Sequence, residues 1–129
     1  MKYISGFISA LELKNVIQNG MENQYLMIDL RDKSEYDEFH IKGSVNIEYV
    51  DFMRLQDYED LIEKAMSGKT IVLCCERGGS SIYASRRLID YIRKRQNEYE
   101  KKGIGISKDN SIVVKSLSGG IYGFRNLYM

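Results

Sequence analysis

Apolar residues along this chain of 129 amino acids occur in two patterns, and the alternation between them predicts the order of its elements. Continuous apolar runs are typical of strands that are buried on both faces of a sheet. The run at 70–75, TIVLCC, is the strongest, and the run at 24–30, QYLMIDL, is similar. Shorter apolar segments at 44–47 and 111–117 are predicted as two further strands.

The segments between these runs space their apolar residues three or four apart, which is the pattern of helices. Ser9 followed by Glu12 predicts a capping box, and the helix that begins there is expected to end at Gly20. Ser34 is the candidate cap of a short helix at 34–39. The other predicted helices cover residues 51–66, 80–101 and 120–127, and residues 101–110 are predicted as an exposed loop.

Helices that alternate with strands predict an α/β fold, in which a mostly parallel sheet is covered on both faces. A chain of this length is expected to form one domain over residues 1–129. Its net charge of +1 creates no overall field that would attract nucleic acid or a membrane surface. The N-terminus lacks the apolar segment of a signal peptide, and no run of about 18 apolar residues indicates a transmembrane helix.

The two cysteines of the chain, Cys74 and Cys75, are adjacent and therefore cannot join distant parts of the fold. Together with the single histidine, His40, they are too few for a four-ligand zinc site, and we predict no metal and no cofactor. Unpaired thiols fit a reducing compartment, so we predict that the protein is cytoplasmic.

The loop that follows the predicted strand 70–75 has the composition of an anion-binding site. Reactive groups of parallel α/β sheets gather at the carboxyl ends of the strands, where Cys75 stands. Gly78 and Gly79 permit a tight curl whose amide N–H groups point inward, and the next helix adds its positive N-terminal end. Such a cradle favours a thiolate over a thiol, which makes Cys75 the predicted nucleophile.

The neighbours of Cys75 have different predicted roles. Arg77 is a mobile cation that is expected to hold an anionic substrate. Ser80 and Ser81 offer hydroxyls to the thiolate or to a bound oxyanion, although Ser81 is interpreted as a helix cap rather than as a catalytic group. Cys74 points to the opposite face of the strand because side chains alternate, and it is predicted to be inert core.

Residues 75–81, CERGGSS, resemble the active-site loop of rhodanese-like sulfurtransferases, in which a Cys, two variable residues and a Gly lead into a helix. The segment 27–47 is similar to a second motif of that family, which contains Asp-x-Arg, then Glu-Tyr, then His-Ile-x-Gly. Segments 8–13 and 117–124 match the family's ends, so the resemblance spans nearly the whole chain. It implies a central parallel sheet of about five strands, flanked by helices on both faces.

The resemblance also implies a reaction, in which the Cys75 thiolate takes a sulfane sulfur from a small anionic donor such as thiosulfate. The resulting persulfide passes the sulfur to a thiol, to cyanide or to a protein acceptor. Asp29 and Arg31 fall on the Asp-x-Arg pair, which in the family mainly organises the neighbourhood of the loop, and we interpret them as a buried or half-buried ion pair with its hydrogen bonds. His40 is interpreted as structural. The substrate-binding residues that the resemblance implies are Glu76, Arg77, Gly78, Gly79, Ser80 and Ser81.

Four departures separate this chain from the family's pattern. Ser80 stands where many members have Arg, Phe39 replaces the Gly before the motif's His, and Phe124 stands where Trp is common. The fourth departure is the segment 93–110, which is longer than in most single-domain members of the family. A longer helix at this place resembles that of the cell-cycle dual-specificity phosphatases, which share the fold.

Phosphatases or arsenate reductases of that type are the alternative interpretation, and the loop itself tests it. Those enzymes place an Arg six residues after the Cys, because a guanidinium clamps the phosphoryl oxygens in the transition state. Ser81 occupies that position here and the next Arg is Arg86, which weakens the alternative. A non-enzymatic binding module on the same fold is the third interpretation, and the intact Cys75 argues against it.

Overall fold

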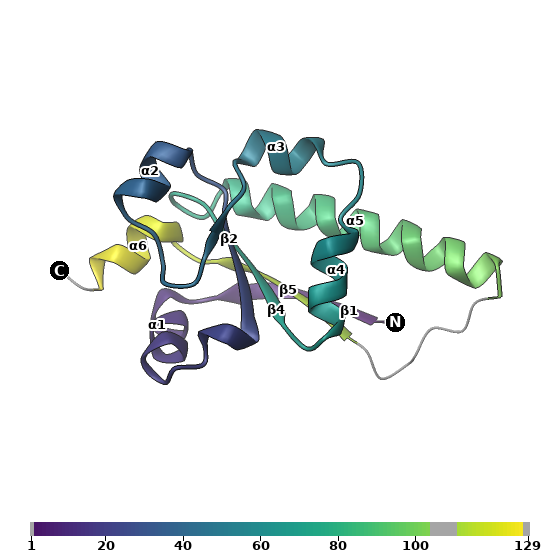
Figure 1. The fold of residues 1–129 in the computed structure, drawn as a ribbon, viewed down its shortest axis with the longest axis horizontal. Helices are drawn as coiled ribbons and strands as arrows, with labels where there is room; N and C mark the ends of the chain where they lie inside the picture. The colour runs from purple at the N-terminus through teal and green to yellow at the C-terminus, as the bar shows by residue number, and fades with distance from the viewer. Residues whose placement is uncertain (1, 104–110, 128–129) are drawn as a thin grey trace.

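The computed structural model describes residues 2–103 and 111–127, which form a five-stranded sheet with helices on both sides (Figure 1). The strands lie in the order β1-β5-β4-β2-β3, and each neighbouring pair is parallel. The predicted fold class is therefore confirmed. The strands are β1 (Lys2–Ile8), β2 (Tyr25–Asp29), β3 (Val45–Asn46), β4 (Thr70–Cys74) and β5 (Ser111–Leu117). The helices are α1 (Ala10–Gln18), α2 (Lys33–Glu38), α3 (Tyr49–Arg54), α4 (Glu59–Met66), α5 (Ser80–Lys101) and α6 (Gly120–Asn126), and a short 3₁₀ helix covers Glu22–Gln24.

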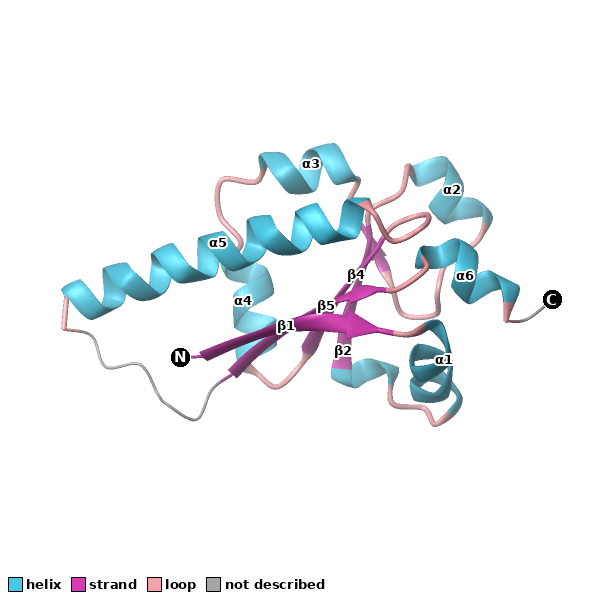
Figure 2. Ribbon diagram, turned by 180° about the vertical axis from the view of Figure 1, so that it is seen from behind, coloured by secondary structure: helices cyan, strands magenta, loops and turns pink. Residues whose placement is uncertain are grey.

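Two apolar clusters, one on each face of the sheet, hold the helices in place (Figure 2). On one face α3, α4 and α5 pack on the sheet through side chains such as Phe52, Ile62 and Leu88, which are fully buried. On the other face α1 and α6 pack through Leu13 and Phe124. The strand β4 serves both clusters because its successive apolar side chains point to opposite faces, which explains its continuous apolar run.

The edge strand β1 is absent from the elements predicted by the sequence pattern. It pairs with β5 at the far end of the chain, from Lys2 opposite Ser111 to Ile8 opposite Leu117. Ile4 and Phe7 leave much of their surface exposed, so no single apolar face marks this strand in the sequence. The strand is therefore defined by its distant partner rather than by its own pattern.

Residues 51–66 form the two helices α3 and α4, so the prediction of one continuous helix is wrong. Between them, the side chain of Tyr58 turns into the core and is 1% exposed. Its hydroxyl donates to the carbonyl of Phe52 at 2.6 Å. The same carbonyl accepts from the amide of Leu55 at 3.3 Å, at the end of α3. A carboxylate oxygen of Asp57 then accepts from the amide of Glu59 at 3.2 Å, at the start of α4.

The predicted helix caps have different outcomes. Ser9 and Glu12 form the predicted capping box at the start of α1. The helix α2 begins at Lys33 with Asp32 in the cap position, so the prediction of Ser34 as its cap is wrong. The amide of Lys33 donates to Glu48 Oε1 at 3.2 Å, a partner supplied by a later segment of the chain.

The helix α5 has the predicted bounds and follows directly after the loop that begins at Cys75. Its buried stripe includes Ala84, Leu88 and Ile92, and its C-terminal part extends past the sheet (Figure 1). Most of the loop predicted at 101–110 lies outside the described residues. Within the described ranges, no helix combines the length and apolar character needed to cross a membrane.

Candidate functional site

The central strand β4 leads into the loop that the sequence singles out. Because β4 lies between β5 and β2, the segments that follow these three strands meet at one end of the sheet. The strand ends at Cys74 and α5 begins at Ser80, so Cys75 is the first residue of the loop. Figure 1 shows this loop at the same end of the sheet as α2 and α6. The loop thus occupies the place where ligand sites form in parallel sheets.

The sulfur of Cys75 accepts hydrogen bonds from the backbone. The amide of Gly78 donates to Sγ at 3.1 Å and the amide of Ser81 at 3.4 Å. Gly78 has a φ of +98°, in the left-handed region that glycine adopts without strain. Ser81 belongs to the first turn of α5, so its amide also adds the positive end of the helix dipole. Both donors therefore direct partial positive charge at the sulfur, where negative charge develops in a reaction of the thiol.

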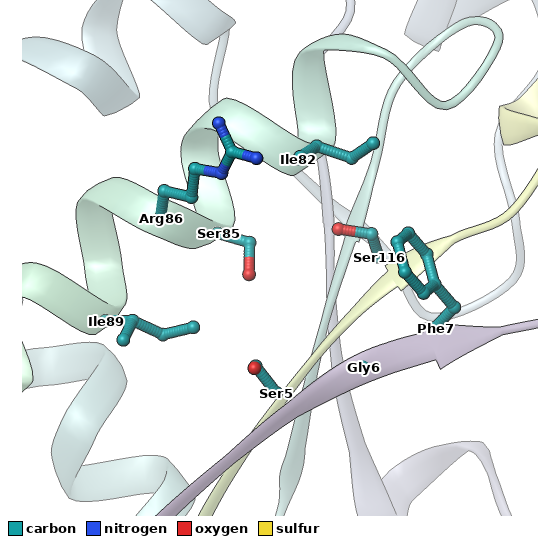
Figure 3. Close-up of a pocket in the computed structure, with 8 residues that line it drawn as sticks. All are labelled: Ser5, Gly6, Phe7, Ile82, Ser85, Arg86, Ile89 and Ser116. Atoms are coloured by element: carbon teal, nitrogen blue, oxygen red, sulfur yellow. The ribbon is translucent and has the colours of Figure 1, made fainter.

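Two serine hydroxyls support the residues that donate to the sulfur. Ser81 Oγ donates to the carbonyl of Gly78 at 3.3 Å, and Ser116 Oγ donates to the carbonyl of Ser81 at 3.2 Å. The cap position of α5 is Gly79, so the interpretation of Ser81 as the helix cap is wrong. Figure 3 shows Ser116 at the edge of a pocket between α5 and β1 that Cys75 does not line.

The first turn of α6 contacts the loop from the side opposite to α5. The amide of Ile121 donates to the carbonyl of Cys75 at 2.8 Å, and the amide of Tyr122 donates to the carbonyl of Glu76 at 3.0 Å. Sequence reasoning missed these residues. The adjacent glycines of the segment 117–124, LSGGIYGF, are the signal that could have pointed to a close contact of two backbones.

The rim of the loop carries the remaining predicted substrate-binding residues. Glu76, Arg77, Gly79 and Ser80 are exposed. The guanidinium of Arg77 lies 5.4 Å from the centre of the Tyr122 ring, a cation–π arrangement that holds it beside the loop. Glu76 lines a small pocket that is shared with side chains of α2 and α6. The structure therefore gathers all the predicted loop residues around the sulfur or at the rim, where a ligand can reach them.

Asp29 and Arg31 form a buried ion pair, in agreement with the interpretation of their sequence motif. The Arg31 guanidinium donates to both carboxylate oxygens of Asp29, at 2.8 Å from Nη2 and at 3.0 Å from Nε. Nη2 also donates to the carbonyl of Phe39 at 2.6 Å. Burial disfavours the charge of Arg31, but the hydrogen bonds and the charge of Asp29 outweigh it and raise the pKa of the guanidinium. Leu30 lies between the two residues of the pair, and its amide donates to the carbonyl of Cys74 at 2.8 Å. This bond connects the ion pair to the end of β4.

Cys74 and His40 have surroundings that fit the structural roles expected of them. Cys74 is fully buried in the apolar cluster beneath α1 and α6, and burial, followed by the charge of Asp29, raises the pKa of its thiol. The ring of His40 stacks on Tyr36 with centroids 3.9 Å apart, and its Nδ1 lies 2.8 Å from the Tyr36 carbonyl. Over residues 2–103 and 111–127, no group of three His, Cys, Asp or Glu side chains is arranged to hold a metal ion.

The family comparison covers nearly the whole chain. The family model described as rhodanese-like domain matches residues 9–127. A search of curated proteins finds no match.

Solved structures of the same fold have diverse descriptions. The human single-domain sulfurtransferase is 16% identical with a TM-score of 0.56, and the match covers 93% of this chain and 95% of that one. The As-Sb reductase from Leishmania major is 20% identical with a TM-score of 0.63, over 97% of this chain and 79% of that one. A protein of unknown function from Rhodopseudomonas palustris, described as a possible tyrosine phosphatase, is 16% identical with a TM-score of 0.62. The match covers 95% of this chain and 81% of that one. At these identities the structures share the fold with this chain, and its activity has to be argued from the loop.

Proposed function

This chain belongs to the rhodanese-like domain family, and from that premise we propose that it is a sulfurtransferase that carries a sulfane sulfur as a persulfide on Cys75. The expected donor is a small anion such as thiosulfate. The expected acceptor is a thiol, cyanide or a thiol on another protein, and the expected compartment is the cytoplasm.

The observation that carries this proposal is the pair of backbone amides that donate to Cys75 Sγ. A persulfide anion has the same charge as a thiolate and extends it by one sulfur atom. The amide donors at Cys75 Sγ therefore suit the negative sulfur of this intermediate. Cys75 follows directly after the end of a strand, and 5% of its surface is exposed. Only a small donor is therefore expected to reach its sulfur atom.

The proposed reaction has two steps that balance without an oxidant. The Cys75 thiolate attacks the outer sulfur of thiosulfate, the S–S bond of the donor breaks, and sulfite leaves with its electron pair. Cys75 then holds a persulfide anion. The thiolate of the acceptor attacks the outer sulfur of this persulfide, and Cys75 leaves as the thiolate that began the cycle.

Arg77 supports an anionic donor in this scheme. It is exposed at the rim of the loop, and the ring of Tyr122 limits the positions that its guanidinium samples. A cation held there attracts the dianionic thiosulfate toward Cys75 and stabilises sulfite as it departs.

The loop argues against phosphoryl transfer. The position six residues after Cys75 is Ser81, whose hydroxyl donates to the Gly78 carbonyl, and the next arginine is Arg86. The Arg86 guanidinium lies 5.8 Å from the centre of the Tyr83 ring, and the side chain lines the pocket between α5 and β1 (Figure 3). A phosphatase site needs a guanidinium on the equatorial oxygens, and the loss of such a donor costs about a hundredfold or more in rate.

Intact mass spectrometry after treatment with thiosulfate tests the proposal directly. We expect one added sulfur on the purified protein, which a thiol or cyanide removes, and no addition to the Cys75→Ser variant. Hydrolysis of p-nitrophenyl phosphate measured on the same samples is the comparison assay. Turnover of the phosphate that depends on Cys75, without any added sulfur, would replace the proposal with the phosphatase alternative, and failure of both assays would favour a binding module.

A further inference from the structure

The peptide groups of the Cys75 loop are oriented by hydrogen bonds to α6. The carbonyls of Cys75 and Glu76 both accept from amides in the first turn of that helix. The described residues contain no cis peptide bond, and in a trans peptide the N–H points opposite to the carbonyl. The two bonds therefore turn the N–H groups of Glu76 and Arg77 away from α6. The carbonyls of Cys75 and Glu76 are thereby kept at α6 and away from the opposite side of the loop.

Gly120 lies at a close approach of the backbones of α6 and the loop. A Cβ atom at this position would lie 2.4 Å from the carbonyl oxygen of Glu76 and 2.5 Å from that of Cys75. Gly120 also has a φ of +63°, in the left-handed region. The atoms that a side chain would meet are backbone atoms, which cannot rotate away as a flexible side chain can. Any other residue at 120 must therefore displace the loop or the start of the helix.

We propose that Gly120 is a positioning residue of the sulfur site, and that it acts by letting α6 approach closely enough to hold the carbonyls of Cys75 and Glu76. Its role is indirect, because the groups that contact the sulfur are the amides of Gly78 and Ser81. The consequence for sulfur transfer rests on the proposed function. The consequence for the reactivity of the Cys75 thiol does not, because alkylation reports the thiolate whatever the physiological reaction is.

Two neighbouring glycines provide matched controls. Gly119 has a φ of +75°, so an alanine there has a similar backbone strain, but its Cβ would meet only the Cα of Gly123 at 3.9 Å, an ordinary contact. Gly123 lies inside α6, and a Cβ there meets nothing within 4 Å. Gly119→Ala therefore reports the cost of the left-handed conformation, because its added methyl group meets no atom of the loop. Gly123→Ala reports the cost of an added methyl group in the same helix.

The test compares Gly120→Ala with these controls by three measurements on the full chain. They are the midpoint of thermal unfolding, the rate at which iodoacetamide alkylates Cys75 at neutral pH, and kcat and KM for sulfur transfer from thiosulfate to cyanide. We expect Gly120→Ala to lower the alkylation rate and kcat by about 10- to 100-fold. We expect Gly119→Ala to lower the unfolding midpoint while both rates stay within about threefold of the wild type, and Gly123→Ala to change none of them substantially.

The outcomes separate the inference from the proposed function. A folded Gly120→Ala protein that is alkylated at the wild-type rate overturns the inference, even when sulfur transfer is intact. Equal losses of reactivity in Gly119→Ala and Gly120→Ala also overturn it, because strain alone would then explain the effect. Slow alkylation of Gly120→Ala supports it even when the wild-type protein transfers no sulfur.

A second pair of variants keeps the test open when Gly120→Ala does not fold. Tyr122→Pro removes the amide that donates to the Glu76 carbonyl, at a position in the first turn where proline is tolerated. Tyr122→Ala removes the same ring and keeps the amide. We expect slower alkylation of Cys75 in the proline variant than in the alanine variant, and equal rates in the two folded proteins would contradict the role of α6.

Discussion

Cys74 and Cys75 are consecutive residues whose sulfur atoms lie in different surroundings. Cys74 faces the cluster beneath α1 and α6, is 0% exposed, and has a thiol whose pKa is raised, first by burial and then by the charge of Asp29. Cys75 begins the loop, and its sulfur accepts from two backbone amides. The alternation of a strand turns the two side chains to opposite faces, and the end of β4 at Cys74 then leaves one thiol in the core and the other in a loop. One step along the backbone therefore separates a thiol in the apolar core from a thiol that backbone amides contact.

Exchange of each cysteine is the strongest test of this contrast. We expect Cys75→Ser to lose sulfur transfer from thiosulfate to cyanide down to background, a loss of about a thousandfold or more, because a hydroxyl cannot carry a sulfane sulfur. Cys74→Ala should keep kcat within a few fold and lose about 1 kcal/mol of the free energy of unfolding, because it leaves a small cavity. Loss of transfer in Cys74→Ala with full activity in Cys75→Ser would reverse the assignment.

Alkylation compares the two thiols within one molecule. At neutral pH we expect iodoacetamide to modify Cys75 of the native protein about a hundredfold faster than Cys74, which burial keeps protonated and out of reach. Peptide mapping after timed quenching measures both rates. Unfolding in denaturant is the control and should make the two rates similar, and comparable rates in the native protein would show that the surroundings do not differ as described.

The ion pair near Cys74 should matter for stability rather than for chemistry. Arg31→Gln leaves the carboxylate of Asp29, which is 0% exposed, without its partner, and we expect a loss of about 3–5 kcal/mol in the free energy of unfolding. Lys33→Ala breaks the exposed pair of Lys33 with Asp37, whose side chains are 75% and 56% exposed, and should cost far less stability because water screens the pair. Denaturant titration measures both losses. Equal losses would mean that burial of the Asp29–Arg31 pair is not what makes it important.

Arg77 should give the smallest effect, confined to the side of Cys75. We expect Arg77→Ala to raise KM for thiosulfate by about three- to tenfold with little change in kcat, because the cation attracts the donor without contacting the sulfur that reacts. Arg86→Ala, an exposed arginine beside the other pocket, is the matched control and should leave both constants unchanged. Steady-state kinetics at low ionic strength gives both parameters, and an unchanged KM in Arg77→Ala would remove it from the substrate site.

Features whose cause is local could be predicted from the sequence alone. The continuous apolar runs of β2 and β4 mark strands because a strand between two layers of helices buries both faces. Ser9 and Glu12 form their capping box within one turn, so no distant residue was needed to predict it. The sequence likewise predicted that Cys75 begins a glycine-rich turn that leads into a helix, because such a turn and a helix start are local features.

Tertiary structure decided the features that depend on partners far away in the chain. The strand β1 requires β5, and the break between α3 and α4 requires a core into which Tyr58 can turn. The bonds from α6 to the Cys75 loop join residues 46 positions apart, and no helix or strand pattern records such a contact. Local sequence can place the thiol at the end of a strand. The orientation of the peptide groups around it depends on how closely a second backbone approaches, and that distance exists only in the folded chain.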